Sequence, residues 1–192
     1  MAKKQEFRPD KPSTSLLSHL LLTKKQQKSV LKWIFYSIFL VVLSVVQDVL
    51  LSRVRLWGAT TELVPCAIFL ICLIEGSQTG SIFSLIAGLL YLFSGTAPGP
   101  YSMVAITFLS IGVCILRQAY LQERFSSVML CEAIALLLYA LVNFAFGLFF
   151  GLTHLSRFYG FLITAALTLL TVPLFYPIAK AINAFGGRSW KE

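Results

Sequence analysis

The sequence predicts an all-α membrane protein folded as a compact bundle of about six transmembrane helices. Its 192 residues are 57% hydrophobic and only 12% charged, with a mean hydropathy of +0.80. Soluble domains average about 25% charged residues. The apolar runs are continuous and show no period of two, and lipid tolerates only helices or closed barrels because every backbone group must be bonded internally. The runs therefore indicate membrane helices rather than barrel strands.

Hydropathy predicts six spans. They cover residues 33–51, 61–75, 77–93, 101–116, 127–150 and 158–181. A single helix over 63–93 would be about 46 Å long, which exceeds a hydrocarbon core of about 30 Å. The polar and flexible stretch Glu75-Gly76-Ser77-Gln78 is the place where such a helix would break. We predict two short spans joined by a tight turn there, with a re-entrant hairpin over 61–93 as the alternative.

The distribution of basic residues predicts the orientation. The net charge is +8, from 16 Lys and Arg against 8 Asp and Glu. With six spans, thirteen of the 16 basic residues fall on the side of the termini, and only Arg53, Arg55 and Arg157 fall on the other. Loops rich in Lys and Arg remain in the cytoplasm, so both termini are predicted to be cytoplasmic. The basic excess then belongs to topology and to an anionic inner leaflet, and it requires no nucleic acid.

Three regions are expected along the chain. Residues 1–32 form a cytoplasmic N-terminal arm, whose first 15 residues are polar and predicted to be disordered. Four leucines at helical spacing then lie beside a lysine cluster, which predicts a short amphipathic helix on the inner leaflet. They are Leu16, Leu17, Leu20 and Leu21. Residues 33–183 form the transmembrane domain, and residues 184–192 form a cytoplasmic tail.

The sequence contains no pattern typical of catalysis or metal binding. The four cysteines show no CxxC spacing and have no nearby histidine, so apolar packing is the favoured interpretation. His19 and His154 stand alone, whereas a metal site needs several ligands. The GxSxG, P-loop and HExxH motifs are all missing. We therefore predict no enzyme activity, no metal and no cofactor.

Four carboxylates touch the predicted spans: Asp48, Glu62, Glu75 and Glu132. The first three lie near helix ends, where solvation at the membrane interface is the favoured interpretation. Such residues otherwise face a bundle interior or a cavity, because a charge at the bilayer centre costs several kcal/mol.

Two polar stripes follow from the helical positions of these groups. One lies on the first span around Asp48, and the other on the fifth span, where Tyr139 and Asn143 follow Glu132 at +7 and +11. Asp48, Glu132 and Asn143 are thus the candidate intramembrane polar residues. They could join helices, form a partner surface or line a substrate cavity. The first two roles are favoured, because no dense acid–base chain crosses the bilayer.

Small residues predict close helix contacts. Gly76, Gly80, Ser84 and Gly88 recur every four residues, so one ridge of the helix has no large side chains. A second helix can approach such a ridge closely. We expect Gly80 and Gly88 to pack within the chain, because a short turn ties their helix to its neighbour. Gly147 and Gly151, in "GLFFG", are the better candidates for a partner surface.

Residues 33–117 resemble the MreD family of bacterial rod shape-determining membrane proteins. The resemblance rests on the successive stretches "VVQDVLL", "LWGATTELVPCAIFLICLIEG" and "GSIFSLIAGLLYLFSGTAPG". Two positions depart from the family pattern. Thr61-Glu62 replaces a frequent Pro-Asp pair, and Tyr91 or a neighbour replaces an aspartate late in the third span, which removes any role for an acidic residue there.

The resemblance implies a non-catalytic scaffold in a bacterial cell membrane. MreD-like proteins act with MreC-like and other cell-wall elongation proteins, and their fold is similar to substrate-binding components of energy-coupling-factor transporters. That similarity supplies an alternative, a small-molecule uptake component for a vitamin-like substrate. Such components often dock through an alanine ridge on the first span, and residues 33–51 contain no alanine. A lipid transporter is a third interpretation. It would need polar residues along a path across the bilayer, and Asp48, Glu132 and Asn143 are the few that the sequence offers.

Overall fold

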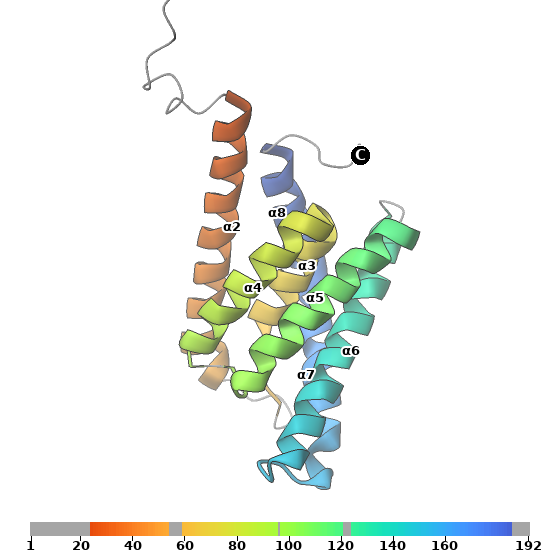
Figure 1. Ribbon diagram of the computed structural model, residues 1–192. Helices are drawn as coiled ribbons and strands as arrows, with labels where there is room; N and C mark the ends of the chain where they lie inside the picture. Colours follow the sequence, from red (N-terminus) through yellow and green to blue (C-terminus); the bar gives the residue numbers. More distant parts are fainter. Residues whose placement is uncertain (1–23, 54–58, 96, 121–123, 186–192) are drawn as a thin grey trace, which may run out of the picture.

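The computed structural model describes residues 24–53, 59–95, 97–120 and 124–185, and these residues are helical with short connections and no β-strand (Figure 1). The helices are α2 (Lys24–Val49), α3 (Leu63–Glu75), α4 (Ser77–Phe93), α5 (Pro100–Tyr120), α6 (Phe125–Phe149), α7 (Phe158–Leu169) and α8 (Val172–Phe185). Single 3₁₀ turns follow α2 and precede α7, at Leu51–Arg53 and Leu155–Arg157. The all-helical prediction is confirmed.

Among the described residues, three helices are long and apolar enough to cross a membrane. Their qualifying segments are Gln27–Val49, Pro100–Gln118 and Phe125–Phe149. A fourth span is possible if the segments Leu155–Leu169 and Val172–Phe185 are taken together, although they are bent by 47°. The remaining apolar helices, α3 and α4, are shorter.

The predicted span 158–181 is therefore two helices, with the break at Leu170 and Thr171. Pro173 supplies the reason. It has no N–H to donate to the Leu169 carbonyl, and its ring would clash with that carbonyl in a continuous helix.

Helix α3 lies at the centre of the bundle. All thirteen of its residues are buried, and it contacts α2, α4, α5, α6, α7 and α8. In Figure 1 it runs behind α4 and α5. Its sequence, LVPCAIFLICLIE, is apolar on every face, and a helix of that kind is stable only when other helices surround it. The other helices of the bundle are thus organised around a central rod about 20 Å long.

The turn between α3 and α4 falls where the sequence predicted the break. Helix α3 ends at Glu75 and α4 begins at Ser77, so Gly76 alone joins them. Its φ of +96° is a conformation that residues with a Cβ rarely adopt. The Gly76 N–H still donates to the Cys72 carbonyl, at 3.1 Å. The choice between two spans and a re-entrant hairpin for 61–93 stays a prediction.

The glycine ridge of α4 packs within the chain. A Cβ added at Gly80 would lie 3.2 Å from Cys72 Cα of α3 and 3.3 Å from Cys114 Sγ of α5. One added at Gly88 would lie 3.5 Å from Met103 Cγ, so its neighbour is α5 rather than α3. Ser84, between them, is fully buried.

Gly147 lies in the last turn of α6 and Gly151 in the turn that follows, where Gly147 is buried and Gly151 is exposed. Gly147 is buried, and an added Cβ would lie 3.0 Å from Thr153 Cγ2 of the following turn. Gly151 has a φ of +69°, which the turn after α6 requires. These local demands account for both glycines, so their spacing carries no argument for a partner surface.

The first helix starts earlier than predicted. Helix α2 begins at Lys24 rather than near Trp33, so residues 24–32 are continuous with the first helix, and Lys32 is buried. Lysine, glutamine and leucine are good helix formers, which lets the polar segment extend the apolar helix. The predicted amphipathic helix at Leu16–Leu21 lies outside the described residues. The predicted tail also lies largely outside them, since α8 continues to Phe185. The start of α2 and the end of α8 lie at the same end of the molecule (Figure 1).

Isoleucine at Gly80 tests the close approach of α4 to α3. Its Cβ would press on the Cys72 backbone, which cannot rotate away, and overpacking of this kind costs about 1–3 kcal/mol. We expect Gly80→Ile to lower the melting temperature in detergent and the protein abundance more than Gly88→Ile does. Gly112→Ile is the matched control, because an added Cβ at Gly112 meets nothing within 4 Å. Equal tolerance at Gly80 and Gly112 would contradict the packing described above.

Candidate functional site: buried polar groups around α3

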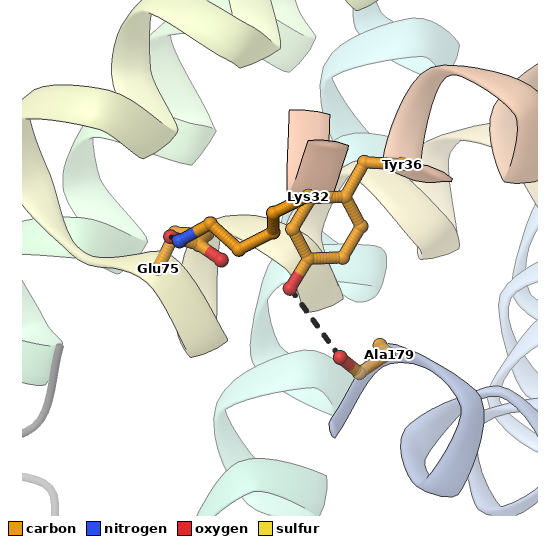
Figure 2. Close-up of polar contacts among 4 residues, drawn as sticks. All are labelled: Lys32, Tyr36, Glu75 and Ala179. Atoms are coloured by element: carbon orange, nitrogen blue, oxygen red, sulfur yellow. Dashed lines mark hydrogen bonds and ion pairs between the residues drawn. The ribbon is translucent and has the colours of Figure 1, made fainter. Parts of the chain in front are cut away.

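A buried ion pair joins α2 to the end of α3. Lys32 Nζ donates to Glu75 Oε2 at 2.6 Å, and the two side chains are only 8% and 2% exposed. Figure 2 shows the lysine extending across the interface to the carboxylate. Charges removed from water are tolerated when they compensate each other directly, and a charge-assisted hydrogen bond of this length is a strong one.

Aromatic residues surround the pair. Tyr36, one turn after Lys32, is fully buried and donates its hydroxyl to the Ala179 carbonyl of α8, at 3.3 Å (Figure 2). The Trp33 ring lies 5.2 Å from that of Phe83 on α4, and Lys32 Nζ is 5.5 Å from the Trp33 ring centroid. Cation–π contact and ring packing thus extend the junction, so that α2 is joined to α3, α4 and α8 at one point.

The prediction for these two residues was wrong. Glu75 was expected to be solvated at the membrane surface and Lys32 to belong to a cytoplasmic arm, yet each is buried against the other. The predicted topology contained the signal, since it placed both residues at the same end of the bundle. Separation by 43 residues hid the contact, because hydropathy does not indicate which helices are neighbours.

An apolar groove lies next to this junction, between α2 and α4. It has a volume of about 310 Å³. Its floor consists of the buried residues Leu40, Phe83 and Ala87, and its exposed rim includes Ile82, Ile86 and Leu90. Ser37 and Thr79 add two hydroxyl-bearing side chains, and Trp33 also lines the groove. The indole contacts described above therefore fix one wall of the groove.

Polar side chains surround the other end of α3, where the first N–H groups of a helix lack partners within it. Gln47 Oε1 accepts from the Val64 N–H at 3.0 Å, and Gln47 Nε2 donates to the Tyr91 hydroxyl at 3.4 Å. The Glu62 N–H donates to Thr168 Oγ1, at 3.1 Å. Side chains of α2 and α7 thus replace water at this buried helix start. Tyr91, late in α4, is part of the same network.

The polar stripe of α6 faces the interior. Glu132, Tyr139 and Asn143 are buried to 0%, 3% and 2% exposure. Tyr139 interacts with Glu62, Tyr91 and Asn143, whereas Asn143 Oδ1 has no hydrogen-bond partner within the part of the chain that the structure describes. Cys66 of α3 is an electrostatic neighbour of Glu132. The stripe is therefore not a surface for a partner.

Asp48, on α2, is partly buried, and it interacts electrostatically with Tyr91. The two predicted stripes thus approach the interior from different helices. Asp48 belongs with the groups at the start of α3, whereas Glu132 lies on the far side of Tyr139 along α6.

The cysteines serve as packing residues in the structure. Cys66, Cys72 and Cys114 are buried and Cys131 is half-buried, all as free thiols. The Cys72 thiol donates to the Gly80 carbonyl at 3.2 Å, and the Cys114 thiol donates to the Gly76 carbonyl at 3.4 Å. Within the described ranges, no three His, Cys, Asp or Glu side chains are grouped to hold a metal ion. His154 is exposed, and His19 lies outside those ranges.

Comparison of the chain with protein-family models, curated proteins and solved structures found no match. Fold and site define a helical protein with helices able to span a membrane, a buried ion pair, an apolar groove and buried polar side chains.

Single and paired replacement of Lys32 and Glu75 tests the junction. Removal of one partner leaves an uncompensated buried charge, which costs about 3–5 kcal/mol. We expect Lys32→Met or Glu75→Gln to lower the unfolding midpoint in detergent strongly. The double variant Lys32→Met/Glu75→Leu should recover most of the loss, because an apolar pair of similar volume is often neutral. A double variant as unstable as the sum of the singles would contradict a direct pairing.

Proposed function

We propose that this protein is a non-catalytic scaffold of the bacterial cell-shape and lateral cell-wall synthesis machinery. In this proposal the groove between α2 and α4 binds a transmembrane helix of an MreC-like partner. The groove is the observation that carries the proposal, and the resemblance of residues 33–117 to the MreD family supports it. Other elongation proteins would join through the same complex.

The chemistry of the groove favours an apolar helix as its occupant. Its walls belong to an apolar helix long enough to span the membrane and to the shorter apolar helix beside it, so that the surrounding medium is lipid. Helices associate in lipid through close van der Waals contact and hydroxyl hydrogen bonds rather than hydrophobic drive. Ala87, Ser37 and Thr79 provide the small and hydroxyl-bearing surface that such contact uses.

We further propose a multi-pass arrangement of six spans in the cell membrane, with both termini in the cytoplasm. The common end of α2 and α8 in Figure 1 supports an even number of passes. The asymmetry of Lys and Arg supports the orientation, and an anionic inner leaflet would contact the basic end. The family resemblance implies a fold similar to energy-coupling-factor substrate-binding components, and we include that fold in the proposal.

Affinity purification from native membranes in mild detergent separates this proposal from the uptake alternative. Recovery of an MreC-like protein and other wall-synthesis proteins supports the scaffold. Recovery of a transporter ATPase would support the small-molecule uptake component instead.

Filling the groove tests the docking surface directly. Ser37 is exposed and lines the groove, so Ser37→Trp fills it without disturbing the buried core. We expect normal abundance, loss of MreC-like co-purification and rounded cells. Ile38→Trp is the matched control, because Ile38 is exposed next to Ser37 but lies outside the groove. Retained co-purification in Ser37→Trp, or equal loss in both variants, would exclude the groove as the partner site.

A further inference from the structure

A second cavity lies at the opposite end of α3 from the ion pair. It has a volume of about 650 Å³, and its lining includes Thr60, Glu62, Arg157, Tyr159 and Thr164. A much smaller cavity of about 10 Å³ shares Glu62, Phe161 and Thr164 with it and also contacts Tyr139 and Asn143. Glu62 thus stands between an outer cavity wide enough for a small organic molecule and an inner cavity that reaches the polar face of α6.

The inner cavity contains a buried polar atom without a partner. Asn143 is more than nine-tenths buried, yet its Oδ1 makes no hydrogen bond within the described residues. Tyr139, equally buried, interacts with Glu62 and Asn143 at the same place. Native structures rarely keep an unsatisfied acceptor at a cavity without a ligand or water to satisfy it.

The Glu62 carboxylate and Asn143 Oδ1 are acceptors that face the cavities. The first N–H groups at the start of α3 are already bound, Val64 to Gln47 and Glu62 to Thr168, and Pro65 has none. The Glu62 side chain does not cap its own helix, and its carboxylate interacts with Tyr139. A ligand group that donates hydrogen bonds is therefore favoured in the inner cavity.

The size of the inner cavity and the number of hydrogen bonds to be made indicate which donor group fits. A volume of about 10 Å³ holds one group the size of a water molecule. A primary ammonium is of that size and has three N–H donors. The Glu62 carboxylate and Asn143 Oδ1 are acceptors, and the Tyr139 hydroxyl can accept as well as donate. The exposed Arg157 side chain, which lines the outer cavity, favours an acidic group on the same ligand.

We propose that the two cavities form a binding site for a small zwitterion that carries a primary ammonium group. The ammonium occupies the inner cavity beside Glu62, and the acidic group extends to Arg157 in the outer one. A free molecule of the amino-acid or phosphoethanolamine type and the headgroup of an ethanolamine phospholipid share this chemistry. The site goes beyond the scaffold function and does not depend on it.

The test uses the full chain in phosphatidylcholine nanodiscs, with phosphoethanolamine and L-alanine as free probes and phosphocholine as the trimethylated control. Calorimetry and thermal shift measure binding. We expect a primary-ammonium probe to bind more tightly than phosphocholine by at least about tenfold, since the trimethyl group has no N–H donor and exceeds the inner cavity. If the free probes do not bind but phosphatidylethanolamine in the nanodisc raises the melting temperature, the ligand is the lipid headgroup.

Variants separate binding from folding. Glu62→Gln and Asn143→Leu should each weaken binding by about tenfold or more. Glu132→Gln is the matched control, because it alters a buried carboxyl of α6 that lines neither cavity. Arg157→Gln, at an exposed position, should weaken phosphoethanolamine but leave ethanolamine unchanged. Binding of neither free probe nor lipid, equal binding of phosphocholine, or unchanged binding in folded Glu62→Gln protein would overturn the proposal.

Discussion

A lysine and a glutamate that leave water must compensate each other, and the arrangement of helices around α3 depends on that requirement. Lys32 can reach Glu75 only if α2 lies against the end of α3, because the bond between them is 2.6 Å long and shielded from solvent. Tyr36 and Trp33, on the same helix, then contact α8 and α4. An unpaired charge at either position would be more costly than most single contacts in the bundle are favourable. The pair therefore specifies which face of α2 is turned inward.

The turn at Gly76 follows from the same junction. Glu75 must end α3 at this point, and the chain must reverse at once so that α4 can pack beside α3. The backbone at residue 76 has a φ of +96°, which glycine adopts readily and residues with a Cβ rarely adopt. Gly80, one turn further along, then allows α4 to lie close to the Cys72 backbone, so that α4 packs directly beside α3.

The two ends of α3 present different chemistry. At its end lies the buried ion pair, and the groove of α2 and α4 extends from Trp33 and Thr79 beside that pair as far as Leu90. At its start, Gln47 and Thr168 satisfy backbone N–H groups, while Glu62, Tyr139 and Asn143 line the inner cavity. The ion pair and the inner cavity therefore lie at opposite ends of a buried helix about 20 Å long.

The sequence by itself determined the helical class and much of the segmentation. Composition and the limited thickness of a bilayer required a break at Glu75-Gly76, and the bounds of α4 agree with the predicted 77–93. These features are local, because hydropathy and backbone conformation act within a few residues. Only the tertiary structure decided that Lys32 joins Glu75, that Gly88 faces α5 rather than α3, and that Tyr139 and Asn143 meet Glu62 at one cavity. Those contacts join residues from 15 to more than 40 positions apart. They depend on which helices pack together, and a pattern of apolar residues does not specify that choice.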